Sequence, residues 1–541
     1  MGGHNKNYNN LKVPATPTAG SLNDILSKAA GGNTFDKSTD SLEAIRDQVD
    51  SVEAKVDGIS TSVSAIPSGI IGVEWNVTTD TWRRIDEYGN TVLLGADYFN
   101  NHPSWDFRRC TLAADGTVNH VGVNGRGDGL DLTGADGRVM VRIPKFYCKA
   151  LMADTDVYRW WVSPTARSGF SLNPAFVQRG GVEKDYIYVG AYAADIEYDG
   201  ADEAYNANDL KLNSRTGKQP VTGNADCIFT VSFDAGDNEP AIGDELTNGT
   251  LAGFYVVDYL KESGAWASND AVGRLWLRKP GVSSCGWAND ETITNVTQSN
   301  TVGVQNGASS GLSVTIANCR TWGGNIGAGW GIMNFWSLSA VQLLYYIEYA
   351  DPDSQTTIGK GIVDKASGTG FNGELNGDDS IDTNMEANGT GTGTGTNGLT
   401  PVAYRGIENL WGNIWQFIDG YNALDAAYRL IKRDGTGTLA DTLAAGSYES
   451  TTGAPITTDG YISNILYEDL TSVAFLAAAV AGLSTSYLHD YWYAHDAGET
   501  NILFAGGSWI SGVNAGVGSR YSSNVSSNVY RDIGARLEFI G

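Results

Sequence analysis

The segment Glu408-Asn-Leu-Trp-Gly-Asn-Ile-Trp-Gln-Phe417 indicates how the chain builds its core. Trp411, Trp415 and Phe417 are large aromatic side chains that remove much apolar area from water when they are buried. Gly412 lies between them, where the absence of a Cβ lets the backbone bend or approach a neighbouring segment closely. The segment therefore predicts a buried structural frame rather than a catalytic centre.

The composition around this segment is that of an acidic globular protein. Of 541 residues, 41% are hydrophobic and 10% are aromatic, so the chain can bury a large core. The 62 acidic residues outnumber the 36 basic ones and give a net charge of −26. Because such a surface repels phosphate backbones, we expect no nucleic-acid partner. The longest apolar run, residues 473–483, is too short to cross a bilayer, so we expect no membrane insertion.

From residue 72 onward, short β-type segments alternate with Gly, Asn and Asp turns. The chain has 68 Gly and only 13 Pro, which favours tight turns on a β scaffold over proline-rich linkers. One helix is predicted over residues 337–350 from its apolar face. Residues 224–310 carry their own set of strands and predict a small β domain inserted into a larger one. The Gly-Thr repeat at residues 388–398 predicts a flexible loop.

Near the amino terminus, apolar residues recur at alternating steps of three and four residues. This 3.5-residue period predicts a left-handed coiled coil over residues 41–67, because the apolar stripe then stays on its partner. Mostly β-branched residues at both core positions favour three strands, so we expect a parallel homotrimer. An amphipathic helix packed on its own subunit is the alternative. Residues 1–40 predict an attachment arm with a short helix. The heptad positions are Leu42, Ile45, Val49, Val52, Val56, Ile59, Val63 and Ile66.

Several motifs follow one another in a fixed order: Gly327-Ala-Gly-Trp-Gly-Ile-Met333 with Trp336, the segment 408–417, Gly506-Gly-Ser-Trp509, and Ile533-Gly-Ala-Arg-Leu537. In this order they resemble the C-type-lectin-type fold of the formylglycine-generating enzymes. More closely, they resemble the variable proteins of diversity-generating retroelements, whose best-known members are phage tropism determinants. The resemblance covers residues 72–223 and 311–541.

This resemblance implies an α+β fold in which the trimeric coiled coil precedes a C-type-lectin-type domain. That domain would occupy residues 136–541, interrupted by the inserted β domain at 224–310, after a β-rich connector at 68–135. The aromatic and arginine residues of the motifs would be scaffold, and they are Trp411, Trp415, Trp509 and Arg536.

The segment between Trp509 and Arg536 has the composition of an antibody-like binding surface. It shows no helical or strand periodicity and is rich in Ser, Asn, Gly, Val and Tyr, which combine rigid aromatic contact area with adaptable hydrogen bonds. The resemblance implies that adenine-directed mutagenesis rewrites such positions and cannot produce Lys, Gln, Glu, Met or Trp. The first four types are absent from residues 506–536, although a plain Gly/Ser surface loop remains the alternative. The predicted variable, ligand-facing set is Ile510, Ser511, Val513, Gly518, Ser519, Tyr521, Ser522, Ser523, Val525, Asn528, Tyr530 and Asp532.

The sequence argues against an enzyme. The last of the five cysteines is Cys319, so the carboxy-terminal half lacks the thiol nucleophile that formylglycine chemistry requires. His489-Asp490 and His495-Asp496 suggest either a metal site, an aromatic binding edge with Tyr491-Trp-Tyr493, or ordinary packing. We expect no metal or other cofactor. Structural calcium at the acidic loops around residues 351–353 stays open, although an EF-hand pattern is absent.

Together these features predict a viral fibre or receptor-binding protein. An amino-terminal arm would join the virion tail or capsid, and three heads would present a hypervariable carboxy-terminal face to a host cell-surface protein or glycan. The amino-terminal residues lack the apolar stretch of a secretory signal, so we expect folding in the host cytoplasm and a final place on the virion surface. A cellular variable lectin-type display protein is the alternative, and a glycan-cleaving fibre enzyme is a further one.

Overall fold

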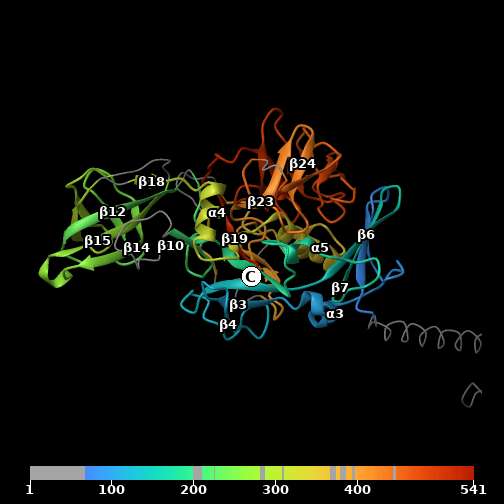
Figure 1. Cartoon of the computed structure of the whole chain (residues 1–541), viewed down its shortest axis with the longest axis horizontal. Coiled ribbons are helices and arrows are strands. Elements are labelled where there is room, and N and C mark those ends of the chain that lie inside the picture. The colour runs from blue at the N-terminus through green and yellow to red at the C-terminus, as the bar shows by residue number, and fades with distance from the viewer. Residues whose placement is uncertain are drawn as a thin grey trace, which may run out of the picture. The chain divides into compact units, whose positions relative to one another are not determined.

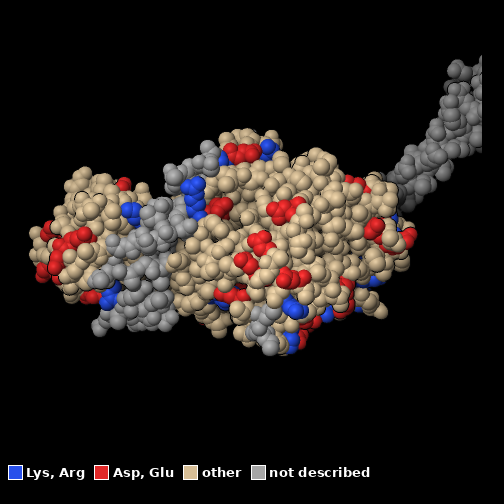
Figure 2. Space-filling view, turned by 90° about the horizontal axis from the view of Figure 1, so that it is seen from above, with Lys and Arg blue, Asp and Glu red and all other residues tan. Residues whose placement is uncertain are grey.

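The computed structural model describes residues 68–198, 210–223, 226–280, 287–307, 310–365, 373–377, 385–392, 396–442 and 446–541. Residues from Pro67 to Gly541 form one compact unit. The predicted arm (residues 1–40) and coiled-coil stalk (residues 41–67), with every heptad position, lie outside the described residues. On the face that Figure 2 shows, acidic side chains are scattered between wide areas without formal charge.

A six-stranded sheet brings distant parts of the chain together at the centre of this unit. The carboxy-terminal strand β33 lies between β19 and β9, and the mark C of Figure 1 lies near the centre of the view. In spatial order the strands are β19 (Trp330–Ile332), β33 (Arg536–Phe539), β9 (Tyr186–Ala193), β5 (Arg138–Pro144), β3 (Arg108–Leu112) and β4 (Val118–Val121).

A second sheet has five strands, in the order β2 (Thr81–Ile85), β1 (Ile71–Asn76), β7 (Val157–Ser163), β6 (Tyr147–Asp154) and β8 (Ser171–Leu172). Its strand β1 pairs with β7, and in the first sheet β3 pairs with β5. Both pairings cross the boundary predicted at residue 135. Val73 and Trp75 of β1 are fully buried, so residues 68–135 supply core strands and are not a separate connector.

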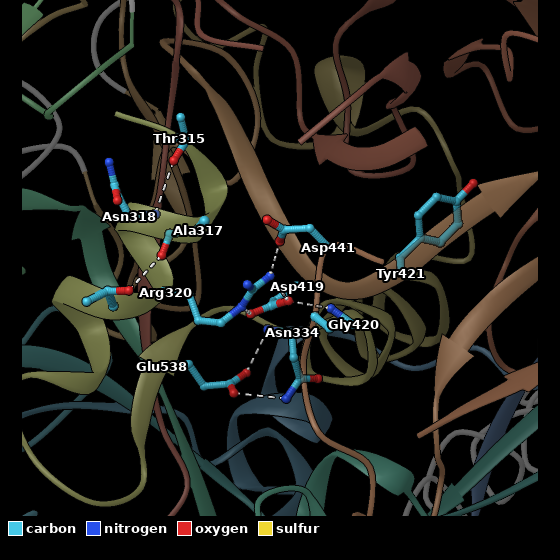
Figure 3. A network of polar contacts seen from close by, with 12 residues as sticks. Thr315, Ala317, Asn318, Arg320, Asn334, Asp419, Gly420, Tyr421, Asp441 and Glu538 are labelled. Carbon is cyan, nitrogen blue, oxygen red and sulfur yellow. Dashed lines mark hydrogen bonds and ion pairs between the residues drawn. The ribbon is translucent and has the colours of Figure 1, made fainter. Parts of the chain in front are cut away.

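The long helix α5 (Phe335–Tyr349) confirms the helix predicted at residues 337–350. It is buried on almost every side, as expected for a helix that is apolar all round. Asn334 caps it by accepting hydrogen bonds from the backbone N–H groups of Trp336 (2.8 Å) and Ser337 (3.0 Å). The buried carboxylate of Glu538 in β33 accepts from the backbone and side-chain nitrogens of Asn334, so the cap is tied to the central sheet (Figure 3).

A second buried carboxylate, that of Asp419, makes an ion pair close to this helix cap. Asp419 accepts two hydrogen bonds from the guanidinium of Arg320, at 2.7 and 2.9 Å, and Arg320 also reaches Asp441 (Figure 3). Arg320 lies on α4 (Ile316–Gly324), and Asp419 lies on β23 (Trp415–Leu424). Bidentate arginine–carboxylate pairs fix orientation as well as distance, so this pair holds α4 against β23.

The range predicted as an insertion forms a closed barrel with its own core. Among the described residues, its strands pair only with one another, and β15 pairs with β12 to close the ring. Phe229, Phe254 and Trp287 fill its interior, whereas Trp276 belongs to the main core. In sheet order the strands are β15 (Ala271–Pro280), β14 (Phe254–Ser263), β13 (Glu245–Thr247), β16 (Thr292–Asn295), β17 (Asn300–Gln305), β12 (Asp226–Gly236) and β18 (Ser310–Leu312).

Short strands and helices complete the unit. Part of the predicted loop at 388–398 is strand β20, which pairs with β21, because its backbone groups find partners there. These shorter elements are β10 (Asp195–Tyr198), β11 (Leu210–Asn213), β20 (Gly391–Thr392), β21 (Val402–Tyr404), β22 (Ile407–Glu408), β27 (Asn464–Ile465), β28 (Ala477–Ala479), α3 (Ala96–Asn101) and α6 (Ser354–Thr357).

The last sheet, in orange and red in Figure 1, carries the carboxy-terminal segment. Its strands are β25 (Tyr448–Ser450), β24 (Ala427–Ile431), β23, β30 (Asn501–Ala505), β31 (Arg520–Asn524), β29 (Tyr491–Tyr493) and β26 (Gly460–Tyr461), and β32 (Ile533–Gly534) pairs in parallel with β23. The segment quoted first leads into β23 and is buried throughout residues 408–417. Gly412 adopts a φ of +77°, and a Cβ there would lie 2.8 Å from the carbonyl oxygen of Ile362, so the predicted close approach is present.

Candidate functional site

Strand β31 gives the predicted variable segment two different sides. Along its residues 520–524, buried and half-buried positions alternate. Tyr521 and Ser523 are half-buried on the outward side, whereas Arg520, Ser522 and Asn524 face the interior. The prediction that this segment lacks strand periodicity is therefore wrong here. The alternation is hidden in the sequence because the inward residues are polar.

The inward residues have partners in the interior that explain their burial. The Ser522 hydroxyl and the Tyr421 hydroxyl are 2.7 Å apart and both are buried. The guanidinium of Arg520 donates to the carbonyl oxygens of Val517 (3.0 Å) and Ser519 (2.9 Å) and to the side chain of Gln342 (2.6 Å). Buried polar groups are tolerated when such hydrogen bonds are made.

Three residues of the predicted ligand-facing set do not reach the surface. Gly518, Ser519 and Ser522 are buried, so a ligand on the outer face does not contact their side chains. At Gly518 an added Cβ would lie 2.7 Å from Asp490 Oδ2 and 2.9 Å from the Tyr346 hydroxyl. Gly518, Ser519 and Ser522 are therefore removed from the predicted ligand-facing set, which keeps the nine positions that are at least partly exposed.

A row of tyrosines lies on the outward side of the neighbouring strands. We call Tyr461, Tyr491, Tyr493 and Tyr521 the tyrosine row; all four are half-buried. The ring centroids of consecutive members are 5.0, 4.7 and 4.4 Å apart, and the last pair, Tyr493 and Tyr521, is stacked. Strand register explains the order, since Tyr461 is opposite Tyr491 and Tyr493 is opposite Tyr521.

The loop after Trp509 extends this face with apolar side chains. Ile510 and Val513 are each 52% exposed. Asn514 connects the loop to the tyrosine row, because its Oδ1 accepts from the Tyr461 hydroxyl (2.6 Å) and its Nδ2 donates to the Tyr493 hydroxyl (3.1 Å). Ser511 is half-buried, and its Oγ accepts from the backbone N–H of Ser508 (2.8 Å).

The remaining predicted positions follow β31. Tyr530 is 43% exposed, and Val525, Asn528 and Asp532 are half-buried. Asn528 donates to the side-chain oxygen of Asn524 at 2.6 Å, which fixes the turn that leaves the strand. Burial raises the pKa of Asp532 above its ordinary value.

The four residues predicted as scaffold are all buried, as a structural role requires. Arg536 donates to Gln416 (2.6 Å) and to the backbone carbonyls of Gly190 (2.8 Å), Glu408 (2.7 Å) and Asn409 (3.0 Å). Its burial lowers its pKa to about 9. The ring of Trp415 meets those of Tyr493 and Tyr521 edge-on, at 6.0 and 5.6 Å, so the frame directly supports the tyrosine row.

A buried carboxylate lies beneath the outer face. Asp490 is 3% exposed and accepts a hydrogen bond of 2.6 Å from the backbone N–H of Gly518. Burial raises the pKa of Asp490 to about 8 and lowers the pKa of Arg520 to about 10. A Cβ at Gly516 would lie 1.7 Å from Asp490 Oδ1, so a residue without a side chain is needed where the loop crosses this carboxylate.

The two histidines lie at different points of this region. His495 is buried, with Nδ1 2.5 Å from Asn501 Oδ1 and Nε2 2.9 Å from Asp425 Oδ1. His489 Nδ1 lies 3.5 Å from a carboxylate oxygen of Asp353; burial lowers the pKa of His489, but this carboxylate outweighs burial and the pKa is raised. In the part of the chain that the structure describes, no three His, Cys, Asp or Glu side chains are placed to hold a metal ion.

The thiols that the structure describes are buried and free. They belong to Cys110, Cys148 and Cys319. Burial raises the pKa of Cys110 and of Cys148 to about 12, so both are protonated at neutral pH. No helix within the described ranges is long and apolar enough to span a bilayer.

Sequence reasoning missed three parts of this site. Tyr461 and Asn514 were not predicted, and for Asp490 a metal site, an aromatic binding edge and ordinary packing were left open. Tyr461 reaches the face through strand pairing across 30 residues, which one sequence does not show. The alternation of Tyr491 and Tyr493 around buried Trp492 is the signal that identifies this strand. No protein-family model and no curated protein matches this chain.

Proposed function

We propose that this protein is a trimeric viral receptor-binding protein and that its carboxy-terminal face binds a ligand on the host cell surface. The ligand-contacting residues are the tyrosine row together with Ile510, Val513, Ser523, Asn528 and Tyr530. The mechanism is recognition, without turnover of a substrate. The fold we propose for the head is of the C-type-lectin type, as in variable proteins of diversity-generating retroelements.

The observation that carries this proposal is the outward row of contacting tyrosines beside exposed apolar residues. Tyrosine offers a large, rigid contact area and a hydroxyl group at little entropic cost, which is why binding surfaces are enriched in it. Ile510 and Val513 add apolar area that is half exposed to water. Exposed apolar area next to aromatic rings favours an interaction surface over an inert loop.

The support beneath the face explains how the outer residues could vary without loss of the fold. Ser522, Arg520 and Asp490 make their hydrogen bonds inward, to Tyr421, Gln342 and the Gly518 backbone. Three of the sequence motifs share one buried core through Trp330, Trp415 and Leu537, and Trp509 of the fourth motif packs in a separate buried cluster with Ile414. Exposed side chains such as Ile510 and Val513 contribute little to this core and can change chemically while the strand stays in place, whereas Tyr493 and Tyr521 pack against the core.

Three linked copies would suit a surface of this kind. Tethered sites turn later contacts into intramolecular ones, so avidity can exceed single-site affinity by about 10²- to 10⁴-fold. A coiled coil formed by residues 41–67 would supply the link, and a face subject to variation could then act with modest contacts at each copy.

Binding of fluorescently labelled full-length protein to a panel of intact bacterial strains tests the proposal. We expect saturable binding to a subset of strains, which Tyr491→Ala reduces strongly. Tyr88→Ala is the matched control, because Tyr88 is 80% exposed and lies outside this face, in the turn between β2 and α3. Equal loss in both variants, or undiminished binding by Tyr491→Ala, contradicts the proposal.

A further inference from the structure

A carboxylate lies at one corner of the tyrosine row. Asp459 precedes Tyr461 by two residues, so the register that sets Tyr461 opposite Tyr491 continues to Asp459 opposite Tyr493. Residues two apart in a strand share one side of the sheet, which puts Asp459 on the outward side with the row. Its Oδ1 accepts a hydrogen bond of 2.8 Å from the backbone N–H of Ala494, which fixes the carboxylate beside β29. Burial and then the charge of Asp459 raise the pKa of Tyr491, as expected for a carboxylate close to that ring.

The carboxylate of Asp459 has no counter-charge among the residues that the structure describes. Asp459 is exposed, and none of the ion pairs formed by these residues includes it. Other exposed carboxylates are paired, such as those of Glu183 with Lys145 and Asp469 with Arg433. The hydrogen bond that Asp459 makes within the described ranges uses Oδ1, so its Oδ2 is open to a donor from a partner.

The rings beside this carboxylate present aromatic faces to a ligand. Tyr493 stacks on Tyr521 at 4.4 Å with 19° between the ring planes, and Tyr491 is tilted by 55° to Tyr493. All of these rings are half-buried, so part of each one meets water. In the described part of the chain no Lys or Arg lies over a ring of the tyrosine row, whereas Arg142 lies 4.5 Å from the ring centroid of Tyr186 on β9. A cation bound at this corner would meet both a carboxylate and an aromatic face.

Of the cations that a partner can present, a guanidinium suits this corner best. It is planar and stacks on aromatic rings, and its fork of N–H donors matches a carboxylate. A quaternary ammonium has no N–H to donate to Asp459, and a lysine ammonium is a compact, strongly hydrated charge without a flat face. The exposed Ile510 and Val513 offer apolar area to the rest of a protein partner, and protein interfaces are enriched in arginine and aromatic residues. The net charge of −26 also favours a basic partner.

We propose that the corner formed by Asp459, Tyr491 and Tyr493 binds an arginine side chain of a partner protein, whose guanidinium pairs with Asp459 and stacks on a tyrosine ring. This inference rests on the proposed receptor-binding function, because it names the group that the face takes from its ligand. Asp459 is then a specificity-determining residue. The tyrosines supply contact area to many ligands, whereas the carboxylate favours those that present a cation.

Selection from a displayed library of random peptides tests this corner without the natural receptor. The full-length protein, its Asp459→Asn variant and its Asp154→Asn variant each serve as bait at physiological ionic strength. Asn keeps a side-chain oxygen for the backbone N–H of Ala494, so Asp459→Asn removes the charge and leaves this hydrogen bond in place. Asp154→Asn is the matched control, because Asp154 is also exposed and its Oδ1 also accepts from a backbone N–H, that of Thr155 at 2.8 Å, at the end of β6 in another sheet.

We expect peptides selected on the unchanged protein and on Asp154→Asn to be enriched in arginine over lysine, and those selected on Asp459→Asn not to be. A selected peptide should bind Asp459→Asn about fivefold or more weakly, and its Arg→Lys form should lose as much on the unchanged protein, because a bidentate charge-assisted contact is removed.

Arginine enrichment that persists on Asp459→Asn, equal enrichment of lysine, no enrichment of arginine, or an equal loss in Asp154→Asn each overturns the proposal. Failure here combined with strain binding that Tyr491→Ala reduces overturns this inference alone. Strain binding that Tyr491→Ala leaves undiminished overturns the proposed function instead, so the two failures are distinguishable.

Discussion

Replacing Ser522 by Asn should destabilise the protein far more than the same replacement at Ser523, its neighbour on β31. Ser522 is fully buried, and its hydroxyl is 2.7 Å from that of Tyr421, which is 1% exposed. Ser523 is half-buried on the outward side. Both variants replace Ser by Asn on the same strand, so the intrinsic β-propensity of the new residue is the same in each. The difference between their free energies of unfolding therefore reports which side of the strand faces the interior.

The magnitude follows from two terms at Ser522. Adding an amide to a packed interior costs about 1–3 kcal/mol, and leaving the Tyr421 hydroxyl without its partner costs about 1–3 kcal/mol. We therefore expect Ser522→Asn to lower the free energy of unfolding by about 2–6 kcal/mol and Ser523→Asn to change it by less than about 0.5 kcal/mol.

Urea unfolding followed by tryptophan fluorescence measures both variants. The expected fall in the urea midpoint is about 0.5–1.5 M for Ser522→Asn, at an unchanged slope of about 4 kcal/mol per M. A double-mutant cycle of Tyr421→Phe and Ser522→Ala isolates the hydroxyl pair, whose members should show a coupling energy of about 0.5 kcal/mol or more. Equal midpoints for the two Asn variants, or destabilisation mainly at Ser523, would refute the two-sided description of β31.

Three further predictions concern the support of the face. Gly518→Ala should lower the free energy of unfolding by about 1–3 kcal/mol, because the added Cβ would press on Asp490 and Tyr346. Gly324→Ala is the control, since nothing is recorded within 4 Å of an added Cβ at Gly324, and it should leave the free energy of unfolding unchanged. Urea midpoints of the two variants measure the difference. Arg536→Lys should destabilise the protein by about 2 kcal/mol or more, because an ammonium group cannot replace the guanidinium that donates to Gln416 and three backbone carbonyls. Thermal melting measures this loss, and Arg108→Lys, at an exposed ion pair, is the control. The pKa of Asp490 is raised to about 8 in the folded protein, so the folded protein binds this proton more tightly than the unfolded chain does. Ionisation of Asp490 therefore lowers the free energy of unfolding as the pH rises from about 4 to about 8. Asp490→Asn should therefore gain stability relative to the unchanged protein across this window, and a constant difference between the two melting curves at pH 5 and pH 8 would contradict the burial of an ionisable carboxyl.

Some elements could be predicted from the pattern of residues within one short segment. Others depend on pairing between strands that are far apart in the sequence. Helix α5 was predicted because its apolar residues recur over a long segment. The buried turn at Gly412 was predicted because few residues other than glycine suit a backbone at φ +77°. The barrel at residues 226–312 lies where the sequence has a separate set of strands.

The errors arise where polar residues fill interior positions or where distant strands pair. Ser519, Ser522 and Arg520 look like surface residues, yet interior partners satisfy their hydrogen bonds. Residues 68–135 look like a connector because their pairing with β5 and β7 is invisible in one sequence. Tyr461 joins the candidate site for the same reason, through its register with Tyr491.

The most direct test of the central claim compares two libraries of the full-length protein. One library is randomised at the outward positions Ile510, Val513, Ser523, Asn528 and Tyr530, and the other at the inward positions Ser519, Arg520, Ser522 and Asn524. Each is displayed, screened for resistance to protease and then selected for binding to hen lysozyme. We predict that most outward variants stay resistant and yield binders, whereas most inward variants lose resistance. Equal resistance in the two libraries, or resistant outward variants that yield no binder, would contradict the claim that this face is a variable binding surface on a fixed frame.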